Sequence, residues 1–377
     1  MTERRATGLR IAVDLRALVG RPSGIGFFTL AMLRQLARGE GRYLGLSHRP
    51  VSMAADLELA GVELEHQPAP LGVAWQQLVL PRRLARDHDL DVFWSPLFTL
   101  PVTIPLSLPA VVTVHDLTPV LLPETHRLKV RLSILPFLER SLTRARRILA
   151  DSRSTADDLR RQFPYCASRL EVVYPGVDPE FRPAGEEAIQ RIRQGLDCPD
   201  GYVFFAGTLE PRKNVAVLLD AWEAIKRADP EAPRLVLAGP YGWRSRALVR
   251  RIQSLEPLGL KHLGHVERSR LVELFQAARV FVLPSLYEGF GLPAAEAMAC
   301  GVPTIASDSS SLPEVVGDAG ILVGSQDGAT LAIELRRLLR EPALARELAA
   351  RGIERVRRFS WTEAASRMEE AFRQATG

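Results

Sequence analysis

Short apolar runs alternate with stretches of helical periodicity along almost the whole chain. This alternation is typical of parallel sheets whose strands are connected by helices. In the first half we predict a helix at 27–38 and four strands, at 9–14, 92–94, 110–115 and 147–150. In the second half we predict strands at 202–206, 234–238, 261–263, 280–283 and 304–306, a spacing that suits a six-stranded doubly wound sheet.

Chain length and a break in this pattern indicate two domains. The 377 residues exceed the size at which a single hydrophobic core usually stops growing. The stretch YPGVDPEFRPAG, residues 174–185, carries prolines, glycines and acids without periodicity, so we place the linker there. We predict an α/β domain over 1–177, a second α/β domain over 178–360, and an amphipathic helix at 361–377.

The composition is that of a globular protein, with 46% hydrophobic and 25% charged residues. No apolar stretch reaches the roughly 18 residues of a membrane-spanning helix, and the polar start MTERRATG lacks the apolar core of a secretory signal. We therefore expect a cytoplasmic protein. The three cysteines are too scattered for a disulfide framework or a zinc site. Only four of the 49 basic residues are lysine, which favours phosphate and carboxylate partners over nucleic acid.

The most informative segment is EGFGLPAAEAMACGVPTIAS, residues 288–307. It follows the predicted strand 280–283, and Pro293 suits the first turn of a helix. Two glycines let the backbone approach a ligand, and the N–H groups of Phe290, Gly291 and Leu292 favour an anion at the helix start. Glu288 precedes this turn, and Glu296 lies one turn into the helix. A carboxylate accepts two hydrogen bonds, so Glu296 suits a ribose diol and Glu288 suits a hydroxyl of a sugar.

This segment resembles the signature of the retaining glycosyltransferases of family 4, with its two glutamates and the intervening FGLP. The resemblance implies the GT-B fold, two Rossmann-like parallel-sheet domains facing a cleft, with the last helix crossing back to the first domain. It also implies that Glu288 contacts the transferred sugar, that Glu296 holds the nucleotide ribose, and that the turn amides face the diphosphate.

The segment GTLEPRKNV, beginning at Gly207, places two adjacent cations before a helix that Asn214 helps to start. Arg212 and Lys213 can neutralise a diphosphate, and charge-assisted hydrogen bonds strengthen as a leaving group gains charge. This segment also resembles the family. By the same resemblance, backbone groups around His265 and Val266 meet the nucleotide base, although the choice between guanine and uracil stays open.

Two features of the first half are weaker. Gly24 and Gly26 follow the first strand, but Thr29 stands where a dinucleotide-binding fingerprint needs a small residue. We expect these glycines to form a mobile loop, which in the family meets the donor diphosphate. His115 ends the strand at 110–115 and begins HDLTP, a segment that the family shares. We expect it to donate a hydrogen bond to the transferred sugar or to the leaving phosphate.

Asp89 and Asp91 resemble the metal-binding acid pair of the other large glycosyltransferase fold, GT-A. We reject that interpretation because the pair leads directly into the strand at 92–94, with no sugar-nucleotide loop around it. No metal or other cofactor is expected. The segment 126–149 alternates arginine with apolar residues at near-helical spacing, which is compatible with an anionic membrane or a lipid-diphosphate acceptor, and equally with a solvated helix.

The sequence therefore predicts a glycosyltransferase that moves a hexose, with mannose favoured, from a nucleoside diphosphate sugar to a glycan or lipid-linked acceptor. GDP-mannose is the expected donor, with peripheral contact at the inner face of the membrane left open. Two alternatives remain: a sugar-nucleotide epimerase of the same architecture and a non-catalytic sugar-nucleotide-binding protein. A nicotinamide dehydrogenase is disfavoured by the defective glycine loop at Gly24.

Overall fold

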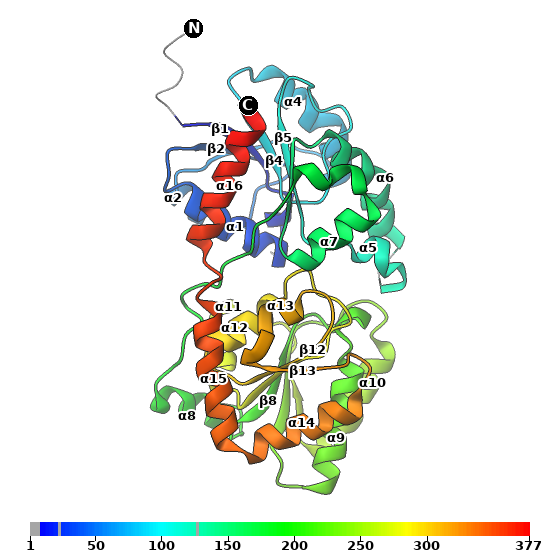
Figure 1. Ribbon diagram of the computed structural model, residues 1–377, viewed down its shortest axis with the longest axis vertical. Helices are drawn as coiled ribbons and strands as arrows, with labels where there is room; N and C mark the ends of the chain where they lie inside the picture. The colour runs from blue at the N-terminus through cyan, green and yellow to red at the C-terminus, as the bar shows by residue number, and fades with distance from the viewer. Residues whose placement is uncertain (1–7, 22–23, 126–127) are drawn as a thin grey trace. The chain divides into compact units, whose positions relative to one another are not determined.

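Two parallel β-sheets organise the chain, and each belongs to its own unit in the computed structural model (Figure 1). The structure describes residues 8–21, 24–125 and 128–377, with side chains at 129–131 and 133 excepted. One unit comprises Met1–Gly176 together with Phe359–Gly377, and the other comprises Val177–Arg358. We refer to them as the N-terminal unit and the C-terminal unit.

The N-terminal unit is built on seven parallel strands in the order β3-β2-β1-β4-β5-β6-β7. β5 illustrates why they form: its residues AVVTV are all buried, because helices cover both faces of a parallel sheet. The strands are β1 (Arg10–Asp14), β2 (Arg42–Ser47), β3 (Glu63–His66), β4 (Val92–Ser95), β5 (Ala110–Val114), β6 (Arg147–Ala150) and β7 (Leu170–Val172).

Helices connect these strands, and the last helix of the chain belongs to this unit as well. The helical elements are η1 (Arg16–Leu18), α1 (Gly24–Leu36), α2 (Ala54–Leu59), α3 (Gly72–Ala74), η2 (Trp75–Val79), α4 (Leu80–Arg86), α5 (Thr118–Leu121), η3 (Pro123–Thr125), α6 (Leu128–Arg144), α7 (Arg153–Gln162), η4 (Pro164–Arg169) and α16 (Trp361–Thr376). α16 lies along α1, and its Phe372 ring contacts Trp94 of β4 at 6.0 Å between centroids. Gly176 permits the chain to pass close to Trp361, whose backbone nitrogen would lie 2.2 Å from any β-carbon there.

The C-terminal unit has six parallel strands in the order β10-β9-β8-β11-β12-β13. They are β8 (Tyr202–Ala206), β9 (Arg234–Ala238), β10 (Leu260–His262), β11 (Val280–Leu283), β12 (Thr304–Ser307) and β13 (Ile321–Val323). The helical elements are α8 (Glu186–Gly195), η5 (Pro211–Lys213), α9 (Val215–Ala228), α10 (Arg246–Leu255), η6 (Glu256–Leu258), α11 (Arg268–Ala277), α12 (Leu292–Ala299), α13 (Leu312–Val316), η7 (Gly317–Ala319), α14 (Gly328–Arg340) and α15 (Pro342–Val356).

A run of aromatic rings forms part of the core of this unit. Phe275 of α11 lies 5.1 Å from Phe204 of β8 and 5.2 Å from Phe281 of β11, measured between ring centroids. All three side chains are fully buried. Burial of rings of this size stabilises the fold by about 1.5–3 kcal/mol each, so the rings hold α11 against the two central strands.

The predicted α/β architecture of two Rossmann-like sheets is confirmed, and every strand predicted from the sequence is present within a residue or two of its expected bounds. Four strands were not predicted: β2, β3, β7 and β13. β3, with the sequence ELEH, lies at the sheet edge and is half charged, so it lacks the apolar run on which the prediction depended.

The expectation of a mobile glycine loop before the first helix is wrong for the residues that the structure describes. Gly24 and Gly26 both lie in the first turn of α1, which begins three residues earlier than predicted. Glycine can adopt helical φ and ψ as other residues do, and here Gly26 is buried while Thr29 Oγ1 donates to the carbonyl of Ile25 one turn earlier. Both glycines are therefore helical in the described part of the chain.

Among the described residues, no helix combines the length and the apolar character needed to cross a membrane. The arginine-rich segment begins at His126, which lies outside the described residues. Most of it forms α6, on which the side chains of Leu128 and Leu132, one turn apart, are exposed. Neither exposed leucine identifies a partner, so membrane contact stays a prediction.

Candidate active site

The carboxyl ends of β8 and β11 bring two loops of the C-terminal unit together. The strands are parallel neighbours, with Phe281 opposite Phe204, so the loops that follow them leave the sheet at the same edge. The amide of Leu286 donates to the carbonyl of Arg212 at 2.9 Å, which ties the second loop to the first. This contact joins the predicted basic pair to the predicted glutamate segment.

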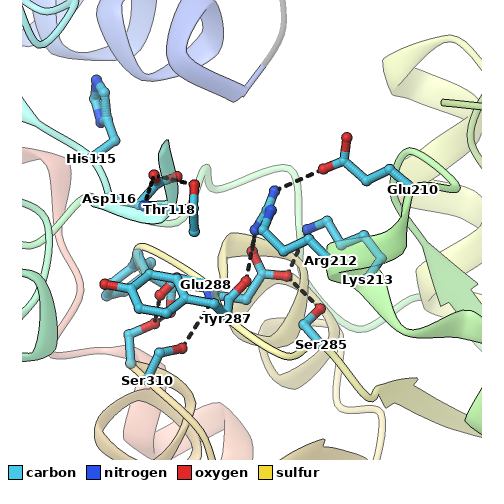
Figure 2. A network of polar contacts seen from close by, with 12 residues as sticks. His115, Asp116, Thr118, Glu210, Arg212, Lys213, Ser285, Tyr287, Glu288 and Ser310 are labelled. Atoms are coloured by element: carbon cyan, nitrogen blue, oxygen red, sulfur yellow. Dashed lines mark hydrogen bonds and ion pairs between the residues drawn. The ribbon is translucent and has the colours of Figure 1, made fainter. Parts of the chain in front are cut away.

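Glu288 is the centre of a buried charge network (Figure 2). Its Oε1 accepts from Lys213 Nζ and from Ser285 Oγ, both at 2.6 Å. Its Oε2 accepts from Arg212 Nη1 at 2.9 Å. The same arginine donates to the carbonyl of Tyr287 at 2.8 Å. The predicted acid and the two predicted cations therefore form one cluster, although the sequence separates them by 75 and 76 residues.

The cluster is electrically balanced. Arg212 Nη2 also donates to Glu210 Oε1 at 3.2 Å, so two carboxylates face two cations. Burial raises the pKa of Glu288, but the charges of Lys213 and Arg212 outweigh burial and lower that pKa to about 2. Burial lowers the pKa of the Lys213 ammonium, and the Glu288 carboxylate opposes that change. Glu288 is therefore ionised at neutral pH.

The turn after Glu288 has the predicted conformation. Gly291 has φ of +98°, in the left-handed region, and it caps α12 with Pro293 in the first turn. Two serines brace this turn from the chain segment after β12. Ser310 Oγ accepts from the amide of Glu288 at 2.8 Å, and Ser311 Oγ donates to the carbonyl of Phe290 at 2.8 Å. The helix start, with the amides of Phe290, Gly291 and Leu292, is thus held rigidly.

Glu296 lies one turn into α12 in a different environment. Its side chain is buried, yet no hydrogen bond to its carboxylate occurs among the described residues. Burial raises its pKa to about 7, although the charge of Arg268 opposes that rise. The positive charge of Arg268 is shared, because this guanidinium pairs with Asp178 and Glu180. Glu296 is therefore a buried carboxyl group with unused hydrogen-bonding capacity, which a ligand hydroxyl can satisfy.

Gly207 and Val266, both predicted to bind the donor, lie at the same edge of the sheet. Gly207 follows β8 with φ of +146°, and Gly239 follows β9. The two glycines lie so close together that a β-carbon on Gly239 would be 2.0 Å from the Gly207 carbonyl oxygen. Val266 lies in the loop between β10 and α11. Because the order is β10-β9-β8, this loop is separated from the basic pair by one strand. The arrangement leaves an elongated edge for a ligand with several parts.

His115 belongs to the N-terminal unit, where it directly follows β5. Its Nδ1 lies 2.6 Å from Asp151 Oδ2, and its Nε2 lies 2.8 Å from the carbonyl oxygen of Pro96. Both ring nitrogens therefore have partners within their own unit. The expected hydrogen bond to a sugar or phosphate stays a prediction, and it requires one of these two contacts to be exchanged.

Family models match both units. The model of Glycosyltransferase Family 4 matches residues 22–181, and that of Glycosyl transferases group 1 matches residues 187–356. The chain is 33% identical over 310 residues to the O-antigen chain mannosyltransferase B of Escherichia coli, a match that covers 81% of this chain and 80% of the relative. The chain belongs to glycosyltransferase family 4.

Other relatives match over a shorter length. A D-inositol 3-phosphate glycosyltransferase of Streptomyces bingchenggensis is 35% identical over 243 residues, which is 61% of this chain and 53% of the relative. Among solved structures, Anabaena Alr3699/HepE in complex with UDP-glucose has a TM-score of 0.76 at 18% identity, covering 96% of this chain and 98% of the other. This likeness shows the GT-B fold. The chain is therefore a glycosyltransferase of GT-B architecture.

Several residues of the site were not predicted from the sequence of this chain. Ser285, Ser310 and Ser311 support Glu288 and its turn, while Glu210 and the Asp178–Arg268 pair set the charge around the cluster and around Glu296. The run SDSSS at 307–311 gave no sign of this role, because Ser310 and Ser311 contact the glutamate turn from more than 20 positions away.

Asn214 and Asp91 each precede the element expected from the sequence. Asn214 does precede α9, but it starts the helix without a side-chain cap: its Nδ2 donates instead to the carbonyls of Pro284 and Ser325, at 3.1 Å and 2.6 Å. Asp91 immediately precedes β4, as expected, and accepts the amide of Arg10 at 2.8 Å. Among the described residues, no group of three or more His, Cys, Asp or Glu side chains could hold a metal ion. The expected independence from metal stays a prediction.

Proposed function

We propose that this glycosyltransferase moves a hexose, with mannose favoured, from a nucleoside diphosphate sugar to a glycan or lipid-linked saccharide acceptor and retains the anomeric configuration. The observation that carries the proposal is the arrangement around α12. A balanced cluster of Glu288, Glu210, Arg212 and Lys213 lies before the helix start. The carboxyl group of Glu296, which accepts no hydrogen bond from the described residues, lies one turn beyond. These groups match the sugar, diphosphate and ribose of one donor molecule.

The diphosphate is assigned to the cations and the amides of the turn. An ammonium has three N–H donors, and Lys213 uses one of them on Glu288. The remaining two can bind phosphate oxygens without breaking the ion pair. The amides of Gly291 and Leu292 precede the first hydrogen bond of α12, which Ala294 makes to the Gly291 carbonyl, and amides in this position favour an anion. Glu288 then serves two purposes, since it positions both cations and lies where a hydroxyl of the transferred sugar would be recognised.

The ribose is assigned to Glu296 because its buried carboxyl group lacks any hydrogen bond in the described part of the chain. Two neighbouring hydroxyls can donate to the two oxygens of one carboxylate. A diol would thus use acceptor oxygens that make no hydrogen bond within the described part of the chain. The base is assigned to the loop of Val266, through backbone groups that do not decide between guanine and uracil.

The chemistry follows from charge. Cleavage of the glycosidic bond places negative charge on the departing diphosphate, and Arg212 and Lys213 are held in fixed positions by Glu288 from which they can stabilise that charge. Glu288 is held by three donors and is a poor nucleophile in that state. We therefore propose an oxocarbenium-like transition state in which the departing phosphate takes the proton of the acceptor hydroxyl. The proposed retention of the anomeric configuration is supported by membership of glycosyltransferase family 4, and not by any single residue of the site.

GDP-mannose is the proposed donor. The support is the similarity to a relative named as an O-antigen chain mannosyltransferase. Mass spectrometry of products from purified protein with guanosine, uridine and thymidine diphosphate sugars tests this assignment. We expect transfer or slow hydrolysis with GDP-mannose that survives excess chelator. Activity with a different nucleoside diphosphate sugar and none with GDP-mannose would refute the assignment of the donor. Loss of activity in chelator that manganese restores would refute independence from metal.

The same products separate the alternative functions. An epimerase would convert the donor sugar without any acceptor and would leave the nucleotide attached. A non-catalytic binding protein would show affinity for the donor and no product at all. The two cations held by Glu288 favour a reaction over binding alone, because cations beside the diphosphate would stabilise the charge that it gains as it departs.

A further inference from the structure

Three neighbouring strands of the N-terminal sheet end at one place. β4, β5 and β6 are adjacent and parallel, with Val114 opposite Ala150 in the register. His115 and Asp151 are the residues that follow this pair, and Pro96 follows β4. Because parallel strands end at the same edge, the topology itself brings the imidazole and the carboxylate side by side.

The His115 ring is held from every side that the structure describes. Nδ1 is 2.6 Å from Asp151 Oδ2, and Nε2 is 2.8 Å from the Pro96 carbonyl oxygen. Phe28 and Phe98 meet the ring edge-on, with centroids 4.9 Å and 5.5 Å away. Thr155 Oγ1 donates to the carbonyl of His115 at 3.2 Å. The residue is only 7% exposed, so its orientation is fixed by the unit in which it lies.

The two contacts of the ring require two protons. A carbonyl oxygen and an ionised carboxylate are acceptors only, so both ring nitrogens must donate to make both hydrogen bonds. A neutral imidazole has one N–H and satisfies one of them. The geometry is therefore that of an imidazolium ion.

The surroundings of Asp151 lead to the same conclusion. Its second oxygen, Oδ1, is buried and has no hydrogen-bond partner, and no lysine or arginine pairs with it among the described residues. A buried carboxylate without a cation is strongly unfavourable. The His115 ring is its one ionic partner in this part of the chain, so the charge of Asp151 is compensated only if the ring is protonated.

We propose that Asp151 is a positioning residue that keeps His115 oriented and positively charged at the carboxyl edge of the N-terminal sheet. The proposal rests on the proposed function and on the role expected for His115 from the sequence, as a donor to the transferred sugar or to the leaving phosphate. A charged donor stabilises an oxygen that gains negative charge better than a neutral one does. The donor proton is that on Nε2, and a substrate oxygen would replace the Pro96 carbonyl as its acceptor.

The charged groups that act on His115 oppose the effect of burial. Burial lowers the pKa of the ring, but the charge and hydrogen bond of Asp151, with a smaller contribution from Asp116, raise it above its usual value. Asp116 is directed to α5, where its Oδ1 accepts from the amide and the hydroxyl of Thr118 at 2.9 Å and 2.6 Å (Figure 2). Removal of the Asp151 charge should therefore lower the pKa of His115 more than removal of the Asp116 charge would.

The test is Asp151→Asn, which keeps the size of the side chain and an acceptor oxygen but removes the charge. Asp158→Asn is the matched control, because Asp158 is a buried carboxylate of α7 in the same unit whose ionic partner is Arg161. One readout is the NMR titration of the His115 ring, assigned by its disappearance in His115→Asn. The second is the dependence of kcat on pH, with the melting temperature recorded for each variant.

We expect His115 in the unmodified protein to titrate above about 6.5, its usual value, and below that value in Asp151→Asn. At pH 8 the variant should lose about tenfold or more in kcat, while at pH 6 the deficit should shrink to about threefold. Asp158→Asn should leave both the titration and the pH profile unchanged. A purely structural role would instead lower kcat by the same factor at every pH, and that outcome overturns the proposal.

The titration also separates this proposal from the proposed function. If the unmodified protein transfers no sugar, the proposed function fails, while the titration still decides whether Asp151 keeps the ring charged. If Asp151→Asn does not fold, the titration of the unmodified protein decides alone. A value at or below about 6.5 there refutes the proposal.

Discussion

Glu288 and Glu296 lie in one short segment, yet their surroundings move their pKa values in opposite directions. Burial raises both, but Lys213 and Arg212 reverse the effect at Glu288 and lower its pKa to about 2. At Glu296 the opposing cation is already shared with two acids, and the pKa rises to about 7. A pair of carboxyl groups in such different states suits two different tasks on one ligand.

Arg212→Ala tests whether the basic pair acts in the transition state. We expect kcat to fall by about 100-fold or more, while the affinity for the free nucleoside diphosphate changes much less, because the arginine acts on charge that develops during cleavage. Steady-state kinetics and calorimetric titration measure the two effects. Arg251→Ala is the matched control, since this arginine pairs with Asp220 and Glu223 on the surface of the same unit. An equal loss of turnover and affinity would indicate uniform binding.

The raised pKa of Glu296 predicts that donor binding depends on pH. A diol donates to the ionised carboxylate, so binding favours that form and weakens as pH falls through about 7. Between pH 8 and pH 6 we expect the Kd of the donor sugar nucleotide to increase by up to about tenfold. Calorimetry without acceptor measures this change. In Glu296→Gln the affinity should be lower and nearly independent of pH, and a dependence that persists in that variant would assign it to another group.

At the scale of elements, the turn between β11 and α12 depends on a single glycine. Gly291 has φ of +98°, and a β-carbon there would lie 2.7 Å from Leu312 Cδ2 of α13. The left-handed conformation permits the turn to place Glu288 and the helix amides together, which side chains other than glycine rarely allow.

Gly291→Ala should therefore lower the free energy of unfolding by about 1–3 kcal/mol, from backbone strain and the contact with Leu312. Gly185→Ala is the control: Gly185 precedes α8 with φ of −71°, and nothing lies within 4 Å of an added β-carbon. Chemical denaturation compares the two variants. Equal stability of both would show that the turn relaxes without strain.

At the scale of the whole molecule, the last helix completes a unit that begins about 350 residues earlier in the chain. Met368 and Phe372 of α16 are fully buried in the same core cluster as Phe28 and Leu33 of α1. The covalent order of the chain therefore differs from the order of its folded units. Stability of the N-terminal sheet depends on residues that follow the C-terminal unit in the chain.

Phe372→Ala should remove about 3–5 kcal/mol from the packing of the N-terminal unit and leave the C-terminal unit unaffected. Hydrogen exchange followed by mass spectrometry tests this: exchange should increase in β1 and β4 and stay unchanged in β8 and β11. Arg373→Ala, on the exposed face of the same helix, should change neither. Equal loosening of both sheets would mean that the two units unfold as one.

The sequence by itself determined the features that depend on local pattern. Fully buried strands such as β5 and β11 are continuous apolar runs, and the glycine turn before α12 carries its own conformational requirement, so both were predicted. Family 4 could be suggested from the same stretch because its two glutamates and the intervening FGLP lie close together in the chain.

The tertiary structure decided which groups meet. The order of strands places β8 beside β11 and β5 beside β6, and only then does Glu288 meet Arg212 and Lys213, and His115 meet Asp151. Burial, which sets the charge states of these groups, depends on the whole packed unit and leaves no local sign in the sequence. Edge strand β3 was missed for the related reason that its stability comes from pairing with β2, and its own charged side chains do not indicate a strand.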